Sequence, residues 1–471
     1  MKRYRLYIWT TCLLAVALLL TACSSDGADG LLEEQKPTQQ SVPTANYINL
    51  RIVSGSSQQT RATEQEENAI YDGILAIFEG DDEATATLKS AVVIDQLINN
   101  PGTSPTVTIT QHLPPNTHYL SSTTHHLYVL ALLNTSATGL DVRSSMLYLN
   151  GSSLAGKTIS QMQSLEINSV GSPTEHVGLF MANAPQTTHI MPEATALFNT
   201  EAEARTAGAA AVTIQVERAA AKVRVTNEAT TLTNILLNDV AGMHPKVHTT
   251  SWSVNKYQTK SYLIRNGSTA ADNWAISVSQ TPTAFTANDF TLYPQHSQSG
   301  DEVYIAENTT TTTDQQTEVI VEVQLKDASN MLIGDCYTFH PFGGQQTALI
   351  TSTSALVNFL KAGLTNEQKS VYGLSARTAD EVFKLPAFYI HADGTVTMTL
   401  INESFNDDEK AGLTRLAAAL SGWLSGYRQG KMYYTYKIKH NNTPTYGVVR
   451  NNAYNLTLTS ESITAVGRPT P

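Results

Sequence analysis

Short apolar runs of strand length, separated by polar and glycine-containing stretches, recur along most of the chain. Such runs, rich in β-branched and aromatic residues, are typical of strands, whereas helical periodicity is confined to two segments. Because strands with few intervening helices pack as antiparallel sheets, we predict a mainly β protein with two antiparallel β-sandwich domains of the transthyretin-like or Greek-key type and a few short helices. The predicted strands are 47–53, 74–78, 106–110, 127–133, 212–216, 223–225, 319–325, 387–390, 395–400, 432–438 and 454–458, and the predicted helices are 355–361 and 408–424.

The N-terminal residues have the pattern of an export signal. A basic segment with Lys2, Arg3 and Arg5 precedes the apolar run 6–20, and small residues then lead to Cys23. This order predicts a signal peptide over 1–22 and a bacterial lipoprotein cleavage point at which Cys23 carries the lipid. The apolar run is roughly 15 residues, short of the roughly 20 that span a bilayer, so a retained transmembrane anchor is the weaker interpretation.

The segment after Cys23 divides into a tether, a strand and a polar loop. Residues 24–46 are mostly small and polar, which predicts a flexible tether. The strand 47–53 alternates so that Ile48, Leu50 and Ile52 share one face. A second polar stretch, 54–68, contains Arg61 followed by Ala62. Since polar loop tips are preferred sites of proteolysis, Arg61 is a candidate cleavage site.

Charge and cysteine content exclude two classes of protein. The net charge of -11 and the absence of a Lys/Arg cluster after residue 5 argue against a nucleic-acid partner. Of three cysteines, Cys12 lies in the signal and Cys23 takes lipid, which leaves Cys336 without a partner for a disulfide. Stability must therefore come from burial of apolar side chains.

One motif matches a phosphate-binding loop letter for letter. Residues 151–158 read Gly-Ser-Ser-Leu-Ala-Gly-Lys-Thr and follow a predicted strand at 146–149. A working loop of this kind requires a parallel α/β sheet and a metal-binding Asp on another strand, and the sequence predicts neither. We interpret the match as a glycine-rich turn.

Other candidate sites are weaker, and we expect no catalytic, cofactor or metal site. His244 and His248 have the spacing of two metal ligands on a helix, but Pro245 argues against a helix there. Cys336 and His340 lie in an apolar run where cysteine is typically an inert core residue. The pair at 125–126 lacks a nearby carboxylate in sequence. We therefore predict that the protein is not an enzyme.

Several segments together resemble the fimbrillins of Bacteroidales type V pili, a family of two-domain β-sandwich pilins made as lipoprotein precursors. The resemblance rests on the order of these segments over nearly the whole chain. They are the Cys23 signal with the strand and Arg61-Ala62, the segment Val216 to Val223, the segment Tyr304 to Thr309, the segment Gly430 to Tyr434, and the segment Val448 to Tyr454.

The resemblance implies an assembly mechanism. In the family an arginine-specific protease removes the lipidated segment together with the first strand, which here places the cut after Arg61 and makes 23–61 a propeptide. The implied domains are then 62–217 and 218–471, with a boundary near Glu217-Arg218. Loss of Ile48, Leu50 and Ile52 would open a groove for a donor strand from a neighbouring subunit. The implied partners are other fimbrial subunits, the processing protease, the outer membrane through the precursor lipid, and host proteins or glycans.

The C-terminal residues favour one position in a fibre. Shaft-forming members carry an additional strand at this end, whereas residues 467–471 here read Gly-Arg-Pro-Thr-Pro. Because proline cannot pair inside a sheet, we expect a subunit that accepts a donor strand without giving one, which is a tip or accessory pilin at the cell surface.

Two alternatives remain open. The first is a shaft pilin, or an anchor pilin that keeps Cys23, with the strand at Tyr454 as donor. The second is a surface glycan-binding lipoprotein, for which Trp252, Trp274 and Trp423 are candidate contacts, although tryptophan in a sandwich is more commonly a core residue.

Overall fold

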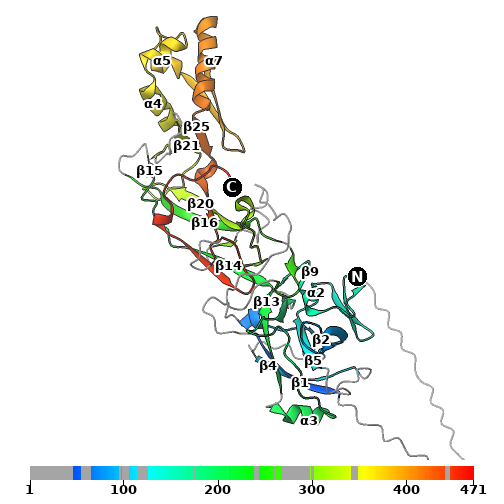
Figure 1. Cartoon of the computed structure of the whole chain (residues 1–471). Helices are drawn as coiled ribbons and strands as arrows, with labels where there is room; N and C mark the ends of the chain where they lie inside the picture. Colours follow the sequence, from blue (N-terminus) through cyan, green and yellow to red (C-terminus); the bar gives the residue numbers. More distant parts are fainter. Residues whose placement is uncertain are drawn as a thin grey trace, which may run out of the picture. The chain divides into compact units, whose positions relative to one another are not determined.

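Strands dominate the described part of the protein. The computed structural model describes residues 46–54, 65–94, 97, 106–114, 126–173, 177–208, 211–237, 243–258, 260–266, 297–298, 302–340, 348–440 and 446–471. Strands, short helices and connecting turns within these ranges confirm the predicted mainly β class (Figure 1). No helix within these ranges is both long and apolar enough to cross a membrane.

A seven-stranded sheet organises the first part of the chain. Its strand order is β3-β2-β5-β12-β13-β1-β4. The strands are β1 (Tyr47–Val53), β2 (Gly73–Gly80), β3 (Thr87–Val93), β4 (Thr106–His112), β5 (His126–Leu133), β12 (Met181–Asn183) and β13 (Val212–Arg218). Alternate residues of β2 reach opposite faces, so Ala76 and Phe78 enter one buried cluster while Leu75 and Ile77 enter another. The sheet is therefore covered by apolar side chains on both faces.

Short elements surround this sheet. β6, β7 and β8 form an antiparallel meander, and both short helices begin with a capping box, Thr158 with Gln161 and Thr200 with Glu203. The elements are η1 (Gln65–Asn68), β6 (Leu140–Arg143), β7 (Met146–Leu149), β8 (Ser152–Ser153), α2 (Ile159–Gln163), β9 (Glu166–Ile167), β10 (Gly171–Ser172), β11 (Gly178–Leu179) and α3 (Glu201–Thr206).

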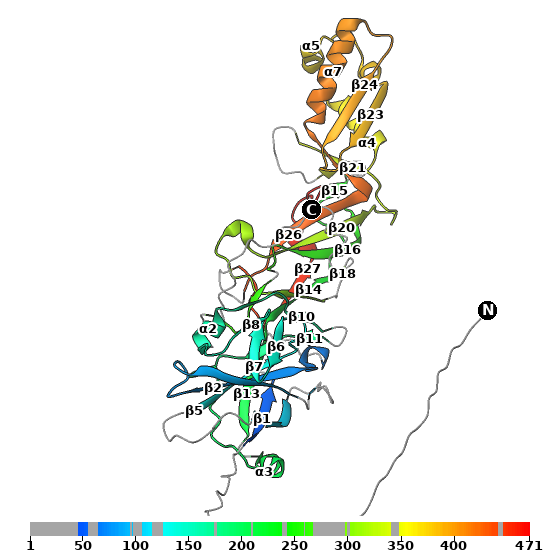
Figure 2. The same ribbon diagram turned by 90° about the vertical axis from the view of Figure 1, so that its right-hand side faces the viewer.

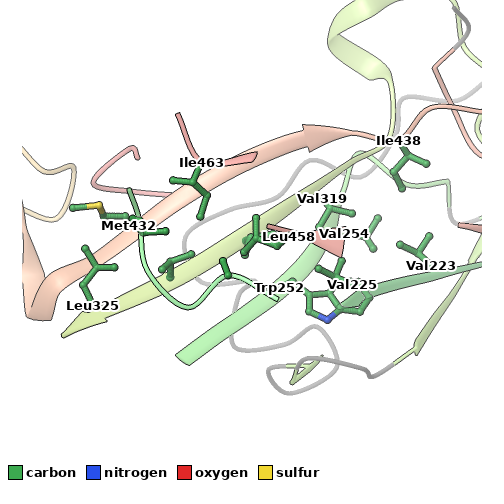
Figure 3. Close-up of a cluster of buried hydrophobic side chains, with 14 of the residues drawn as sticks. Val223, Val225, Trp252, Val254, Val319, Leu325, Met432, Ile438, Leu458 and Ile463 are labelled. Carbon is green, nitrogen blue, oxygen red and sulfur yellow. The ribbon is translucent and has the colours of Figure 1, made fainter. Parts of the chain in front are cut away.

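Two sheets enclose a second core later in the chain. One has the order β19-β14-β27 and the other β18-β16-β20-β26. Their strands are β14 (Ala220–Asn227), β16 (Lys246–Asn255), β18 (Ser297–Gln298), β19 (Glu302–Ala306), β20 (Glu318–Lys326), β26 (Lys431–Lys437) and β27 (Ala453–Leu458). The buried side chains of Val223, Trp252 and Val319 meet in this core (Figure 3). This arrangement is a sandwich, as predicted.

Minor elements join these sheets. They are β15 (Leu236–Leu237), β17 (Ser261–Tyr262), η4 (Thr313–Gln315), β22 (Ala348–Leu349), η6 (Arg428–Gly430) and η7 (Ser460–Ser462). Three pairings in the protein are parallel, namely β1 with β13, β14 with β27, and β15 with β22. The sequence prediction was of antiparallel sheets; residue periodicity marks a strand's buried face and carries no information about the direction of its neighbour.

A separate α/β insert lies between β21 (Cys336–Phe339) and β25 (Leu424–Tyr427), which pair with each other. It contains α4 (Thr353–Gly363), α5 (Asn366–Val371), α6 (Ala379–Val382), β23 (Leu385–Ile390), β24 (Val396–Ile401) and α7 (Asp407–Ser421). Helix α7 packs on β24, and the insert has its own buried core (Figure 2).

The insert confirms part of the sequence prediction. Both predicted helices are present, but the second ends at Ser421, because Leu424 belongs to β25. Asp393 and Gly394 do form the turn between β23 and β24, where Gly394 has a positive φ of 82°. Helices α5 and α6 were not predicted, since helices of one or two turns show little periodicity.

Candidate functional site

The first strand is an interior member of its sheet. β1 pairs parallel with β13, with Leu50 opposite Val212, and antiparallel with β4, with Leu50 opposite Ile109. The Tyr47 N–H also donates to the Phe198 carbonyl at 2.9 Å. Figure 1 shows β1 in blue beside β4, with α3 packed against both strands. Removal of β1 would therefore expose two sheet edges that face each other across a slot.

The apolar face of β1 is fully buried. Ile48, Leu50 and Ile52 are each 0% exposed and belong to the core on one side of the sheet. At about 1.5–3 kcal/mol for each buried aliphatic side chain, the three contribute on the order of 5–9 kcal/mol. Arg51, on the other face, is exposed. The face predicted from alternation is confirmed, and its burial makes the slot strongly apolar.

The segment that contains the predicted cleavage site begins and ends at neighbouring points. Ser54, at the end of β1, donates a hydrogen bond from its hydroxyl to the Asn68 side-chain oxygen at 3.3 Å. Between them, Arg61 and Ala62 lie outside the described residues, as does Cys23. Lipidation and cleavage at these residues therefore stay predictions.

A buried charge network holds the chain directly after this segment. Glu67, in η1, is 1% exposed and accepts from Lys222 Nζ at 2.7 Å and from the Tyr304 hydroxyl. The Arg218 guanidinium donates to the Glu67 carbonyl at 2.9 Å and to Asn68 Oδ1 at 2.6 Å. Although burial lowers the pKa of Lys222, its hydrogen bonds to Glu302 and Glu67 raise that pKa above its ordinary value. Lys222 is therefore held in its charged form.

Two more buried ion pairs lie at the junction between β13 and β14. Arg265 contacts Glu217 at 2.6 Å, and Arg450 contacts Glu307 at 2.7 Å, with all four side chains at most 3% exposed. The Asn451 N–H donates to the Ala220 carbonyl at 2.7 Å. The segments 216–223, 304–309 and 448–454, which carry the family resemblance, thus meet at one place. The signal in the sequence is a set of charges inside otherwise apolar runs.

The C-terminal segment is engaged by tyrosines. Tyr433 and Arg468 exchange two backbone hydrogen bonds of 2.9 Å, at the outer side of the edge strand β26. The hydroxyl of Tyr427 donates to the Gly467 carbonyl at 3.0 Å, and Tyr434 accepts from the Gly467 N–H at 3.1 Å. Burial raises the pKa of Tyr427 to about 12, so these hydroxyls remain protonated donors.

The match to a phosphate-binding loop is a turn of the meander. Gly151 and Gly156 adopt positive φ, and the backbone of residues 156–157 exchanges hydrogen bonds with Leu88 of β3. Thr158 caps α2 with its side chain. The neighbouring strands β6, β7 and β8 are antiparallel, so the parallel sheet that such a loop requires is absent around it.

The histidine and cysteine candidates do not converge. His244 accepts or donates at the Ile235 carbonyl, 2.7 Å away, and His248 is exposed on β16. Cys336 is fully buried in the sandwich core, which raises the pKa of its thiol and leaves it unreactive. His340 instead contacts the Thr338 hydroxyl. Among the described residues no three potential metal ligands gather.

Two other sequence interpretations are resolved by position. His126 lies 2.7 Å from Glu193, an exposed ion pair; the expectation of no nearby carboxylate was wrong because the two residues are brought together from distant segments. His125 is outside the described residues. Trp252 is a core residue at 1% exposure, Trp423 is half-buried in the insert, and Trp274 is outside the described residues.

The fold and its first strand define a class: a mainly β protein with an N-terminal interior strand joined to the rest through a polar segment. Residues 425–471 match the family model described as major fimbrial subunit protein type IV, fimbrillin, C-terminal. This match covers β25, β26, β27 and the segment after them, and it confirms the resemblance to fimbrillins.

Solved structures of similar proteins include fimbrial proteins. A fimbrilin from Porphyromonas gingivalis W83 is 13% identical, with 91% of this chain and 92% of that chain covered and a TM-score of 0.40. A fimbrial assembly protein from Parabacteroides distasonis is 15% identical over 60% of this chain and 84% of that chain, with a TM-score of 0.33. The tip fimbrial protein Mfa3 from Porphyromonas gingivalis, with a C-terminal truncation, is 10% identical over 64% and 85%, with a TM-score of 0.29. No curated protein sequence matches.

Proposed function

We propose that this protein is a fimbrial subunit of the cell surface, at a tip or accessory position, and that it has no enzymatic activity. It is exported as a precursor with lipid on Cys23, held at the outer membrane, and cut after Arg61. A donor strand from a neighbouring subunit then replaces the first strand. The mature chain comprises the domains 62–217 and 218–471.

The observation that carries this proposal is the position of β1. An N-terminal strand that is interior, fully apolar on one face and followed by a polar segment can be removed to leave a slot with two unpaired edges. Unpaired strands flanking an apolar groove are a template for strand addition. Three buried aliphatic side chains and a restored ladder supply the free energy of the joint.

Accepting without donating is supported by the state of the C-terminal strands. β27 pairs with β14 in the chain's own sheet, and Tyr454 and Leu458 lie in the sandwich core. Donating β27 to a neighbour would require this core to open. The segment after it is held by tyrosine hydroxyls and by the pairing at Arg468. The shaft or anchor alternative requires one of these segments to leave its place.

The proposal is tested by replacing β1 with a peptide. The non-lipidated precursor, with Cys23→Ser, is cut with an arginine-specific protease, and a fluorescent peptide of residues 46–54 is added. We expect the processed protein to bind this peptide. A peptide with Leu50→Asp should bind at least 100-fold more weakly because it places a charge in the core, while Arg51→Ala, at an exposed position, should bind equally well.

The outcomes separate the alternatives. Equal binding of the Leu50→Asp peptide, or a cut elsewhere than after Arg61, would contradict strand replacement. The processed protein incubated alone should remain monomeric by native mass spectrometry; a ladder of polymers would favour a shaft subunit. The N-terminal residue of protein recovered from native cells gives a further test: Ala62 supports processing, and acylated Cys23 supports an anchor or an ordinary surface lipoprotein.

A further inference from the structure

A polar groove lies between the sandwich and the insert. Its volume is about 760 Å³, within the range of small-molecule sites. One wall comes from the β23–β24 hairpin, another from residues 428–433 and Asp335, and a third from the C-terminal residues 469–471. Neither the family match nor the proposed strand exchange uses this groove, which is far in sequence from β1.

An aromatic side chain stands exposed at the hairpin wall. Tyr389 is 60% exposed although it is a large side chain on a strand. Its ring is 4.8 Å from that of His391 in an edge-on arrangement, and His391 Nε2 lies 2.6 Å from the Thr397 hydroxyl. The neighbouring contacts therefore limit the positions of the Tyr389 ring. A fixed, exposed aromatic face is a surface on which the apolar face of a ring can stack.

The charged groups of the groove are held in place and balance each other. Glu322 accepts from Lys431 Nζ at 3.1 Å and from the Tyr433 hydroxyl at 2.8 Å. Arg428 donates to the Ile390 carbonyl at 2.5 Å, and Asp335 accepts from the Gln429 N–H at 3.0 Å. The groove thus presents two carboxylates and two cations, together with hydroxyl and backbone groups. Such a set offers both donors and acceptors without a strong field of either sign.

We propose that this groove binds an uncharged oligosaccharide. A sugar has an apolar ring face that stacks on Tyr389 and hydroxyl groups that both donate and accept hydrogen bonds. The balanced charges of the groove, and the chain's net charge of -11, disfavour polyanionic ligands. The inference rests on the proposed function only for the setting in which the sugar is met, namely the surface of another cell or of a host.

The test uses the full mature chain and a defined probe set. Binding is measured on an array of galactose-, glucose- and mannose-terminated oligosaccharides with sialylated and sulfated counterparts, and the strongest ligand is titrated by calorimetry. We expect uncharged oligosaccharides to bind, and Tyr389→Ala to weaken binding at least tenfold, which corresponds to about 1.4 kcal/mol. Tyr446→Ala, an exposed tyrosine outside the groove, and Leu385→Ala, on the same strand as Tyr389, should bind as the unaltered protein does.

Thermal unfolding of each variant shows whether it is folded, and Asp335→Asn is a second groove variant at an exposed position. Binding restricted to sialylated or sulfated glycans would overturn the inference, as would full binding by both Tyr389→Ala and Asp335→Asn, or no binding to any array member. These results are independent of the peptide experiment: a protein that replaces β1 but binds no sugar would leave the proposed function intact.

Discussion

Buried charged residues of this protein are concentrated at the junction of β13 and β14, and their partners come from distant parts of the chain. Arg450 illustrates the principle. Its guanidinium contacts both carboxylate oxygens of Glu307 and also donates to the Tyr262 carbonyl at 2.6 Å. A buried charge that loses its partner cannot be solvated, so these residues depend on one another.

Arg450→Ala should therefore be strongly destabilising. We expect the free energy of unfolding, measured by urea denaturation, to fall by about 3–5 kcal/mol because Glu307 is left buried and unpaired. Arg143→Ala, which removes an exposed pair with Asp141, is the matched control and should change stability little. The double variant with Glu307→Ala should lose less than the sum of the single losses, and simple additivity would contradict the assignment.

His440 predicts a dependence of stability on pH. It is 2% exposed, its Nδ1 lies 2.7 Å from the Tyr454 hydroxyl, and burial together with Arg265 lowers its pKa below 6.5. Because the unfolded chain takes up the proton first, stability should fall as the pH drops below about 6.5 towards the lowered pKa, by up to about 1.4 kcal/mol per pH unit.

The measurement is urea unfolding at pH 7.5, 6.0 and 5.0. His440→Gln should have a flatter profile over this range than the unaltered protein, whereas His248→Gln, at an exposed position on β16, should keep the original slope. The interpretation would fail if the slope were the same with and without His440.

At the scale of elements, the α/β insert is a unit with its own core. α7 is capped by Asn406, whose side chain accepts from the Glu409 N–H at 2.9 Å, while Glu409 reaches back to the Asn406 N–H at 2.9 Å. Its buried residues Leu413, Leu416 and Leu420 contribute to the insert's core and not to the sandwich core. The insert can therefore lose stability without the sandwich.

Asn406→Ala tests this independence. Loss of the cap should cost about 1 kcal/mol and speed amide hydrogen exchange in α7. Exchange in β16 and β20 should stay unchanged, since neither strand shares a core with α7. Equal acceleration in these strands would mean that insert and sandwich unfold as one unit.

At the scale of the whole molecule, Glu67 links the chain after the processing segment to the rest of the protein. It joins η1 to Lys222 on β14 and to Tyr304 on β19. Removal of β1 need not release this residue, because its contacts come from strands other than β1. The network thus separates the strand that leaves from the body that stays.

In the chain cut after Arg61, amides of residues 65–70 should therefore remain protected from hydrogen exchange, while those of β13 and β4 become faster. Glu67→Ala should abolish the protection of 65–70 and lower the free energy of unfolding by about 1–3 kcal/mol, because buried donors lose their acceptor. Glu79→Ala, at a carboxylate outside this network, is the control. Persistent protection in Glu67→Ala would show that the network does not hold this segment.

The comparison between sequence and structure differs from residue to residue. The face of β1 formed by Ile48, Leu50 and Ile52 could be predicted, because alternation places such side chains on one side of a strand. The partners of β1 could not, because pairing depends on β4 and β13, which are distant in sequence. Likewise the motif residues Glu217, Glu307 and Arg450 were recognisable as a pattern, but their meeting in ion pairs required the folded chain.

The sequence by itself determined the mainly β class, the apolar face of the first strand, the two longer helices and the fimbrillin resemblance, since each depends on local periodicity or on the order of motifs. Only the tertiary structure decided that β1 is an interior strand, that Glu67 is anchored to two later strands, and that the insert has a separate core with a groove beside it. The physical reason is that local patterns specify which side of an element is buried, whereas its neighbours are chosen by burial and charge pairing between residues far apart in the chain.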